Sequence, residues 1–330
     1  MRVVVTDRKY EGEDHYSDVV EEAGGEIHFG DYETYDEVIE GCRDADIVIC
    51  SKAPITQDVV EAMGDGELIL RLGTGFDNVD VRAATEQGIP VSNVPVYCNR
   101  EVGEHAVTLM LAAGRDIVDA DRHVRGSSGW GKRADIKPMY DGTFGVIGFG
   151  RIGRAAAGQA AGLGMDVIAY DPYLPDEVVD AFGAESVEFE ELIARSDAVS
   201  VHTPLTAETH HLLGAPEFEA MKDTAVVVNT ARGPIVDVAA LTEAVENGQL
   251  WGAGLDVFES EPPEDSPAFR TDRIICSPHH GGSSAQAKER FIGYVQEKIT
   301  DVIRGGHHGE IVNPEVYRTA YELSPESDNW

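Results

Sequence analysis

Three ionisable side chains in the second half of the chain each follow a predicted strand. Arg232, Glu261 and His279 come after the strands that we predict over 225–229, 252–257 and 273–276. In an open α/β sheet, ligands bind at the carboxyl ends of the strands. The three residue types suit the reduction of a 2-keto acid. That reaction needs a bidentate cation for the carboxylate, a proton donor at the keto oxygen and a base that keeps the donor protonated.

Other histidines stand in pairs that could suggest a metal site. The pairs are His210–His211 and His307–His308. Neither pair has a third ligand at a spacing known for metal sites, so we interpret both as surface histidines and expect no bound metal. His280 directly follows His279 and is, on the residues alone, an alternative proton donor.

A glycine-rich turn in the middle of the chain has the spacing of a dinucleotide site. Gly148, Gly150 and Gly153 follow an apolar strand and open a helix of small residues. The first glycine permits the tight turn, the second lets the backbone approach a pyrophosphate, and the third lets the helix pack closely on the sheet. The phosphates would meet the unpaired amides at the start of the helix, where Arg151 and Ile152 stand.

An aspartate beyond this turn indicates which dinucleotide binds. Asp171 ends the next predicted strand, eighteen residues after Gly153. A carboxylate there can accept hydrogen bonds from both hydroxyls of the adenosine ribose, and it would repel a 2′-phosphate. We therefore expect NAD(H) as the cofactor.

Short β-branched runs alternate with amphipathic stretches through most of the chain, which is typical of parallel sheets covered by helices. The strands predicted in the first half are 2–6, 26–29, 46–50 and 68–70, with helices over 16–23, 35–40 and 57–63. The later strands are 143–147, 166–170, 198–202, 225–229, 252–257 and 273–276, followed by a helix over 283–304. The fold class is therefore α/β, with two doubly wound parallel-sheet domains.

A long helix predicted over 100–125 leads into an irregular segment, 126–141, which contains Trp130, Lys132 and Arg133. The segment is too long for an ordinary connection. Because the protein as a whole is so acidic, we interpret these basic residues as part of a protein interface rather than a nucleic-acid patch.

The charge of the chain is strongly negative, with 60 acidic and 26 basic residues and a formal net charge of −34. Glu188, Glu190 and Glu191 are among the acids at expected surface positions. Such a surface repels nucleic acid and anionic membranes, so we expect neither as a partner. In molar salt the screening length falls to about 3 Å and the self-repulsion largely disappears. The composition resembles that of extreme halophiles, with an acidic mesophilic protein as the alternative.

The cysteines and the N-terminus indicate the compartment. The four cysteines, at positions 42, 50, 98 and 276, form no CxxC motif, so we expect neither a disulfide framework nor a zinc site. No apolar run reaches the length of a membrane span. The first residues predict a strand rather than a signal peptide. We expect a reduced, cytoplasmic protein.

Six motifs, in order along the chain, resemble the D-isomer-specific 2-hydroxyacid dehydrogenase family. That family includes D-3-phosphoglycerate dehydrogenase, glyoxylate and hydroxypyruvate reductases and the C-terminal binding proteins. The resemblance covers about residues 1–315 and rests on LGTGFDNVD (72–80), GVIGFGRIG (145–153), VHTPLTAETHHLL (201–213), VVNTARGPIVD (227–237), GLDVFESEPP (254–263) and SPHHGG (277–282). It implies a Rossmann-type NAD-binding domain over 100–282. It also implies a flavodoxin-like, discontinuous substrate domain formed by 1–99 and 283–330.

The resemblance implies roles for the three ionisable residues. Arg232 would bind the substrate carboxylate, and His279 would donate a proton to the keto oxygen and take it back during oxidation. Glu261 would pair with His279 and favour the imidazolium. The proline immediately before His279 fits the family spacing and favours this residue over His280.

The same resemblance implies further contacts. Asp256 is expected at the nicotinamide carboxamide. The other cofactor contacts are His202, Thr203 and Pro204 on the adenine side, Thr230 and Ala231 on the nicotinamide side, and Thr108. The substrate contacts are Lys52, Ala53, Gly73, Thr74 and Gly75, together with Arg232 and His279. Hydride transfer would occur in the cleft between the domains after closure excludes water. A homodimer formed through the region of 126–141 is also implied.

The resemblance leaves the function open between two classes. The first is an oxidoreductase acting on CH–OH donors, with glyoxylate, hydroxypyruvate, pyruvate and 3-phosphohydroxypyruvate fitting equally well. The second is an NAD-sensing interaction protein like the C-terminal binding proteins, which DVFESEP resembles. Against the second, Gly281, Gly282 and Ser283 stand where the animal co-repressors carry an aromatic residue. Formate dehydrogenase is disfavoured because Glu261 stands where that branch carries an amide. An inward-pointing Lys52 would favour a substrate with a phosphate or a second carboxylate.

Overall fold

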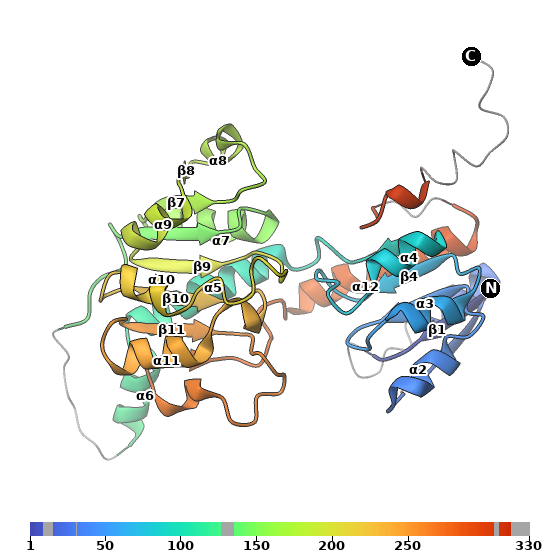
Figure 1. Cartoon of the computed structure of the whole chain (residues 1–330), viewed down its shortest axis with the longest axis horizontal. Coiled ribbons are helices and arrows are strands. Elements are labelled where there is room, and N and C mark those ends of the chain that lie inside the picture. Colours follow the sequence, from blue (N-terminus) through green and yellow to red (C-terminus); the bar gives the residue numbers. More distant parts are fainter. Residues whose placement is uncertain (9–15, 31, 127–134, 307–309, 318–330) are drawn as a thin grey trace. The chain divides into compact units, whose positions relative to one another are not determined.

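The structure is a computed structural model that describes residues 1–8, 16–30, 32–126, 135–306 and 310–317 (Figure 1). Trp130, Lys132 and Arg133 of the predicted interface segment lie outside these residues, as does the pair His307–His308. The chain divides into two compact units. Unit 1 is Met1–Tyr97 with Ala285–Trp330, and unit 2 is Cys98–Ser284. The domain boundaries predicted after residues 99 and 282 each lie two residues from this division.

Unit 1 is built on a five-stranded parallel sheet with the order β2-β1-β3-β4-β5, which is the flavodoxin-like order. Its strands are β1 (Arg2–Val5), β2 (Glu26–Phe29), β3 (Ile47–Cys50), β4 (Leu68–Arg71) and β5 (Val91–Ser92). Its helices are α1 (Ser17–Ala23), α2 (Tyr35–Gly41), α3 (Gln57–Met63), α4 (Val81–Gln87) and α12 (Ala285–Ile303). The central strand β3 is buried at all four residues, as expected for a parallel strand with both faces covered.

Unit 2 is built on a seven-stranded parallel sheet with the order β12-β11-β10-β9-β6-β7-β8. Its strands are β6 (Thr143–Ile147), β7 (Asp166–Tyr170), β8 (Glu185–Ser186), β9 (Ala198–Val201), β10 (Val226–Asn229), β11 (Gly252–Leu255) and β12 (Ile274–Cys276). The chain leaves β6 toward β7 and β8 on one side and then returns to build β9 to β12 on the other. The strand order therefore reverses between β6 and β9, and ligands of such sheets bind at this switch point.

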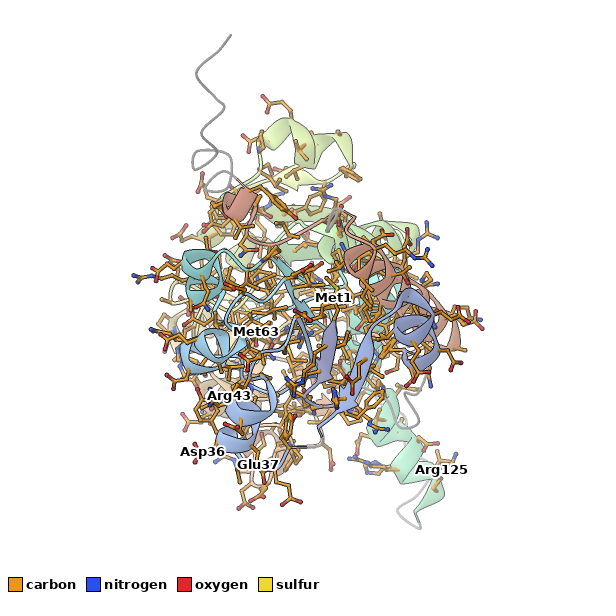
Figure 2. The ribbon with its side chains drawn as sticks, turned by 90° about the vertical axis from the view of Figure 1, so that its right-hand side faces the viewer. Met1, Asp36, Glu37, Arg43, Met63 and Arg125 are labelled. Carbon is orange, nitrogen blue, oxygen red and sulfur yellow. The ribbon has the colours of Figure 1, made fainter. Side chains whose placement is uncertain are left out.

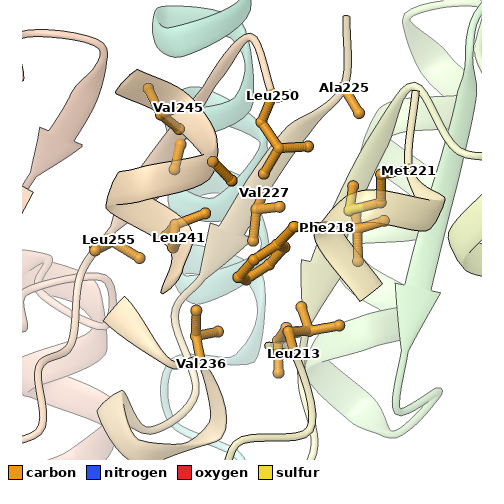
Figure 3. Close-up of a cluster of buried hydrophobic side chains, with 14 of the residues drawn as sticks. Leu213, Phe218, Met221, Ala225, Val227, Val236, Leu241, Val245, Leu250 and Leu255 are labelled. Atoms are coloured by element: carbon orange, nitrogen blue, oxygen red, sulfur yellow. The ribbon is translucent and has the colours of Figure 1, made fainter. Parts of the chain in front are cut away.

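Two apolar cores cover the faces of the second sheet. Along β10 the side chains alternate, so that Val227 joins one core while Val226 and Val228 join the other. The first core is closed by α9 (Phe189–Arg195), α10 (Ala215–Ala220) and α11 (Val238–Glu246), with Phe218 and Leu241 facing Val227 (Figure 3). The second is closed by α5 (Asn99–Gly114), α7 (Arg151–Gly162) and α8 (Asp176–Ala181).

The prediction of a single helix over 100–125 was wrong, because the chain forms two helices there. Helix α5 ends at Gly114, and α6 runs over Ile117–Arg125. Between them Asp116 adopts a left-handed conformation with φ 54°, which aspartate tolerates better than most residues. A Cβ at Gly114 would lie 2.7 Å from the sulfur of Met139, so close packing also favours the glycine at this break.

The remaining differences concern element ends, very short strands and the helices α4 and α8 to α11, which were not predicted individually. The strands predicted over 2–6, 198–202 and 252–257 end at Val5, Val201 and Leu255. The strands β5 and β8 were not predicted, because each has only two residues and shows no alternation. None of these differences moves a predicted site residue off a strand end or turn.

Acidic side chains gather on the surface of the described residues. In α2, Asp36, Glu37 and Glu40 are all exposed, and Asp36 and Glu37 project outward in Figure 2. Glu188, Glu190 and Glu191 are exposed as expected. Among the described helices, none combines the length and the apolar composition that a membrane span requires.

Replacing a core aromatic in unit 2 should destabilise the protein far more than replacing an exposed one. Phe218 is 1% exposed and Phe182 is 58% exposed. We expect Phe218→Ala to lower the free energy of unfolding by about 3–5 kcal/mol, through lost burial and the cavity left behind. Phe182→Ala is the matched control, with a loss of about 1 kcal/mol. Urea unfolding followed by circular dichroism measures both, and equal losses would contradict the assigned core.

Candidate active site

Arg232 lies in a turn that a buried asparagine holds at the end of β10. Asn229, the last residue of the strand, is fully buried. Its side-chain oxygen accepts a hydrogen bond from the Ala231 amide at 3.0 Å, and its Nδ2 donates to the Arg232 carbonyl at 2.8 Å. The guanidinium of Arg232 donates to the Ala231 carbonyl at 2.7 Å and keeps partial exposure. Arg232 therefore lies in a turn that Asn229 holds through one backbone amide and one backbone carbonyl.

The next residue brings this turn against the segment that carries Glu261. A Cβ on Gly233 would overlap the backbone of Phe258 and Glu259. Only glycine allows that approach, so the Arg232 turn and the 258–261 segment pack directly on each other. Sequence reasoning missed Asn229 and Gly233, although both stand inside the motif VVNTARGPIVD.

Glu261 and His279 form the pair that the sequence predicts. His279 Nδ1 lies 2.6 Å from Glu261 Oε2. The side chains are 49% and 27% exposed, so the pair is open to a ligand. Glu261 Oε1 also accepts a hydrogen bond from the Phe258 amide at 3.3 Å. Because Nδ1 is engaged, Nε2 is the nitrogen through which His279 can exchange a proton with a ligand.

The loop that carries His279 is tied to the buried carboxylate of Asp256, which follows β11. Asp256 accepts hydrogen bonds from the hydroxyl of Ser277 at 2.6 Å and from the amides of His280 and Gly281 at 3.0 and 2.8 Å. Burial raises the pKa of Asp256, but hydrogen bonds from His105, Ser277, Gly281 and His280 outweigh it and lower the pKa to about 2. The carboxylate therefore stays ionised at all physiological pH values. The predicted contact between Asp256 and the cofactor stays a prediction.

His105, Asp256 and His280 place one ligand atom each within 4.8 Å of the others, a spacing that a metal ion could use. The oxygens of Asp256 already accept the hydrogen bonds from residues 277, 280 and 281. A metal would have to displace some of them. We interpret the group as a hydrogen-bonded cluster that holds the loop.

The glycine turn has the geometry that the sequence predicts. Gly148 has φ 89°, and a Cβ there would lie 2.9 Å from the backbone of His202. A Cβ on Gly153 would overlap the Gly148 carbonyl, whereas Gly150 faces open space as the N-cap of α7. Arg151 is exposed and Ile152 partly exposed at the start of this helix.

Asp171 supports this turn from the end of β7. Its Oδ2 accepts a hydrogen bond from the Phe149 amide at 2.8 Å, and its Oδ1 accepts one from the Tyr173 amide at 3.0 Å. Each oxygen retains a further lone pair for a ligand hydroxyl.

Two buried hydroxyls lie at the ends of the neighbouring strands β9 and β10. Thr203 Oγ1 and Thr230 Oγ1 are buried and have no hydrogen-bond partner within the described part of the chain. Buried polar atoms normally find a partner, so both mark places where a ligand fits. Together with the open backbone at Gly150, they fit a dinucleotide. Pro204 and Thr108 are exposed, and Ala231 is partly exposed.

His202 is neutral at this strand end. Burial lowers its pKa to about 4, and its Nε2 lies 2.9 Å from the hydroxyl of Ser200.

The predicted substrate turns belong to unit 1, whereas Arg232, Glu261 and His279 all belong to unit 2. In the first turn, Asp7 accepts hydrogen bonds from the amides of Ser51, Lys52 and Ala53 at 2.9, 2.6 and 3.2 Å. Asn78 Nδ2 donates to the Ala53 carbonyl at 2.8 Å from the other side. The Lys52 side chain is exposed.

The second predicted turn, 73–75, is held by Val94, which lies just after β5. The Val94 amide donates to the Gly73 carbonyl at 2.9 Å, and Thr74 Oγ1 donates to the Val94 carbonyl at 3.3 Å. Thr74 and Gly75 are partly exposed.

The chain is similar to proteins of known family. Residues 107–281, more than half of the chain, match the model of the D-isomer specific 2-hydroxyacid dehydrogenase, NAD binding domain. A D-3-phosphoglycerate dehydrogenase of Methanocaldococcus jannaschii is 39% identical over 95% of this chain, which spans only 59% of that relative's length. A glyoxylate reductase of Korarchaeum cryptofilum is 37% identical over 85% of this chain and 86% of its own.

A solved structure agrees over nearly the whole chain. The D-lactate dehydrogenase from Aquifex aeolicus, complexed with NAD and lactic acid, has a TM-score of 0.83 and 25% identity. The match covers 95% of this chain and 99% of that one. The family model and this complex support NAD(H) as the cofactor.

The lowered pKa of His202 predicts a pH-dependent stability. As pH falls below about 6.5, the unfolded chain binds a proton at this position, whereas the folded protein stays neutral until about pH 4. The free energy of unfolding should therefore fall across this window. We expect wild type to lose about 2–3 kcal/mol more than His202→Gln between pH 7 and pH 4.5. Urea unfolding at each pH measures the difference, and parallel pH profiles would show that His202 does not titrate abnormally.

Proposed function

Because this chain belongs to the D-isomer-specific 2-hydroxyacid dehydrogenase family, we propose that it transfers a hydride between NAD(H) and C2 of a small 2-hydroxy or 2-keto acid. The reaction is the reversible reduction of a 2-keto acid to its D-2-hydroxy acid, as in the metabolic enzymes of the family. The observation that carries this proposal is the 2.6 Å pair of His279 and Glu261 in the same unit as the Arg232 turn.

Each of the three residues has a distinct task in the proposed reaction. Arg232 binds the substrate carboxylate with its planar guanidinium and orients the keto carbon. His279 holds a proton on Nε2 and gives it to the keto oxygen as C2 is reduced; in oxidation it takes the proton back. Glu261 accepts from Nδ1 and fixes the ring orientation. NADH, when bound, supplies the hydride.

The residues at the ends of β6, β7, β9 and β10 would hold the cofactor. The turn at Gly148–Gly153 would take the pyrophosphate, and Asp171 the adenosine ribose. Thr203 and Thr230 would give their buried hydroxyls to the bound cofactor. A carboxylate at the ribose position favours NAD over a 2′-phosphorylated dinucleotide.

The substrate is a small 2-keto acid such as hydroxypyruvate, glyoxylate or 3-phosphohydroxypyruvate. We assign its carboxylate to Arg232 in unit 2. Lys52 and Gly73 in unit 1 stay predicted substrate contacts. The names of the relatives, D-3-phosphoglycerate dehydrogenase and glyoxylate reductase, support this range. The exposed ammonium of Lys52 favours a substrate with a second negative group.

We also propose a homodimer that works in the cytoplasm at high salt. The exposed acids of α2 and α9 and the net charge of −34 support the salt adaptation. The four cysteines are free thiols, which suits a reducing compartment.

A substrate panel tests the proposed function. In roughly molar KCl, with the repulsion screened, the oxidation of NADH is followed with glyoxylate, hydroxypyruvate, pyruvate and 3-phosphohydroxypyruvate. We expect turnover of at least one keto acid, and a kcat lowered about 10²–10⁴-fold by His279→Ala. His280→Ala is the matched variant. Turnover that survives His279→Ala but not His280→Ala would reassign the proton donor. Tight NADH binding without turnover of any keto acid would instead favour an NAD-sensing protein.

Salt should stabilise the fold because it screens like charges on the surface. We expect the midpoint of thermal unfolding to rise by about 10 °C or more between 0.1 and 3 M KCl, where the screening length falls from about 10 Å to a few ångströms. Differential scanning calorimetry measures the midpoint, and a sucrose series of matched osmolality is the control. A midpoint that does not change with KCl would contradict the salt adaptation and leave the proposed reaction untouched.

A further inference from the structure

Helix α5 presents a histidine to the loop that carries the proposed proton donor. His105 Nε2 lies 2.9 Å from the hydroxyl of Ser277 and 3.3 Å from Asp256 Oδ1. The His105 side chain is 18% exposed and that of Asp256 2% exposed. A Cβ on Gly281 would lie 3.3 Å from the His105 ring and 2.9 Å from Asp256 Oδ2, so this end of the loop packs directly on both side chains.

The hydrogen bonds of Ser277 fix the direction of the contact with His105. Ser277 has one hydroxyl proton, and it donates that proton to Asp256 at 2.6 Å. A carboxylate can only accept, so the Ser277 oxygen must accept from His105. Nε2 of His105 therefore carries a proton and donates it toward Ser277, with Asp256 Oδ1 as a second, longer acceptor. The hydrogen bonds therefore run in one direction, from His105 to Ser277 and from Ser277 to the acceptor Asp256.

The residues of this network flank His279 along the chain. Ser277 stands two residues before it, and the amides of His280 and Gly281 bind the Asp256 side chain directly after it. The His279 amide itself donates to the Asp256 carbonyl at 2.8 Å. His279 has φ 51°, a left-handed conformation that is uncommon for residues with a Cβ. The hydrogen bonds of the cluster hold the loop in this conformation.

We propose that His105 is a positioning residue for His279, acting as a hydrogen-bond donor through Ser277 and Asp256. The effect of His105 on catalysis rests on the proposed function. Its effect on the order of the loop 277–281 does not depend on that function. Loss of the donor leaves Ser277, which is half-buried, and the buried Asp256 without one hydrogen-bond partner. The loop then gains freedom, and His279 spends less time at the place and angle that proton transfer requires.

The test uses three variants of the full-length protein in roughly molar KCl. His105→Ala removes the donor, and His105→Gln keeps an N–H at the corresponding distance from the backbone. Glu104→Ala changes the exposed neighbouring residue on α5 and is the control. Hydrogen–deuterium exchange of peptides that cover 277–281 reports loop order without any need for activity. The kcat, the KM and the dissociation constant of NADH are measured on the same samples, with circular dichroism to confirm folding.

We expect His105→Ala to speed exchange in 277–281 about 10-fold and to lower kcat about 10–100-fold, with KM and NADH binding changed less than about 3-fold. His105→Gln should restore most of both losses, and Glu104→Ala should match wild type. Unchanged exchange in His105→Ala, or a glutamine variant as impaired as the alanine variant, overturns the donor role. If wild type reduces no keto acid but the exchange pattern is as expected, the proposed function fails and the positioning of the loop stands.

Discussion

The carboxylate of Asp256 is almost completely buried, and an ion in that position is stable only if hydrogen bonds replace the water it has lost. Residues 277, 280 and 281 supply them, from the segment that follows the neighbouring strand β12. The loop must therefore fold around the carboxylate, and His279 lies in the middle of this loop. The position of the His279 backbone follows from this constraint. Without the hydrogen bonds to Asp256 the loop could move, and His279 would separate from Glu261. An exposed contact between two such side chains contributes little stability on its own.

A second buried polar side chain acts in the same way one strand away. Asn229 ends β10 as Asp256 follows β11, and it uses its amide to fix the turn that carries Arg232. Gly233 then lets this turn touch the 258–261 segment, which carries the partner of His279. Three ionisable groups are thus placed by two buried polar anchors and one close backbone contact. Asn229 and Asp256 stand at the ends of hydrogen-bonded parallel strands, so the turns that they hold are attached to a rigid sheet.

Much of this could be predicted from the sequence, because the decisive signals are local. The glycine spacing after an apolar strand, the β-branched strands and the order of the motifs indicated both sheets and the residues at their ends. The pairing of Glu261 with His279 was expected and is present. The break between α5 and α6 was missed, because it depends on a left-handed Asp116 and on the packing of Met139 against Gly114. His105 and Ser277 were missed for another reason. They are far apart in the sequence, and only the packing of α5 beside β11 and β12 makes them partners.

The turn at 51–53 has a different chemical character from the loops of unit 2. Asp7 accepts hydrogen bonds from its three amides and Asn78 donates to the Ala53 carbonyl, so no amide of this turn is left for a ligand and its side chains are the groups that vary. Two relatives that are named for different substrates have nearly the same sequence identity to this chain, 39% and 37%. Overall identity therefore carries little information about the substrate. In a fold where buried polar anchors fix the proposed reacting groups, a few exposed side chains such as Lys52 can change without disturbing the proposed chemistry. Differences in substrate among such proteins are then expected at positions of this kind rather than at Arg232, Glu261 or His279.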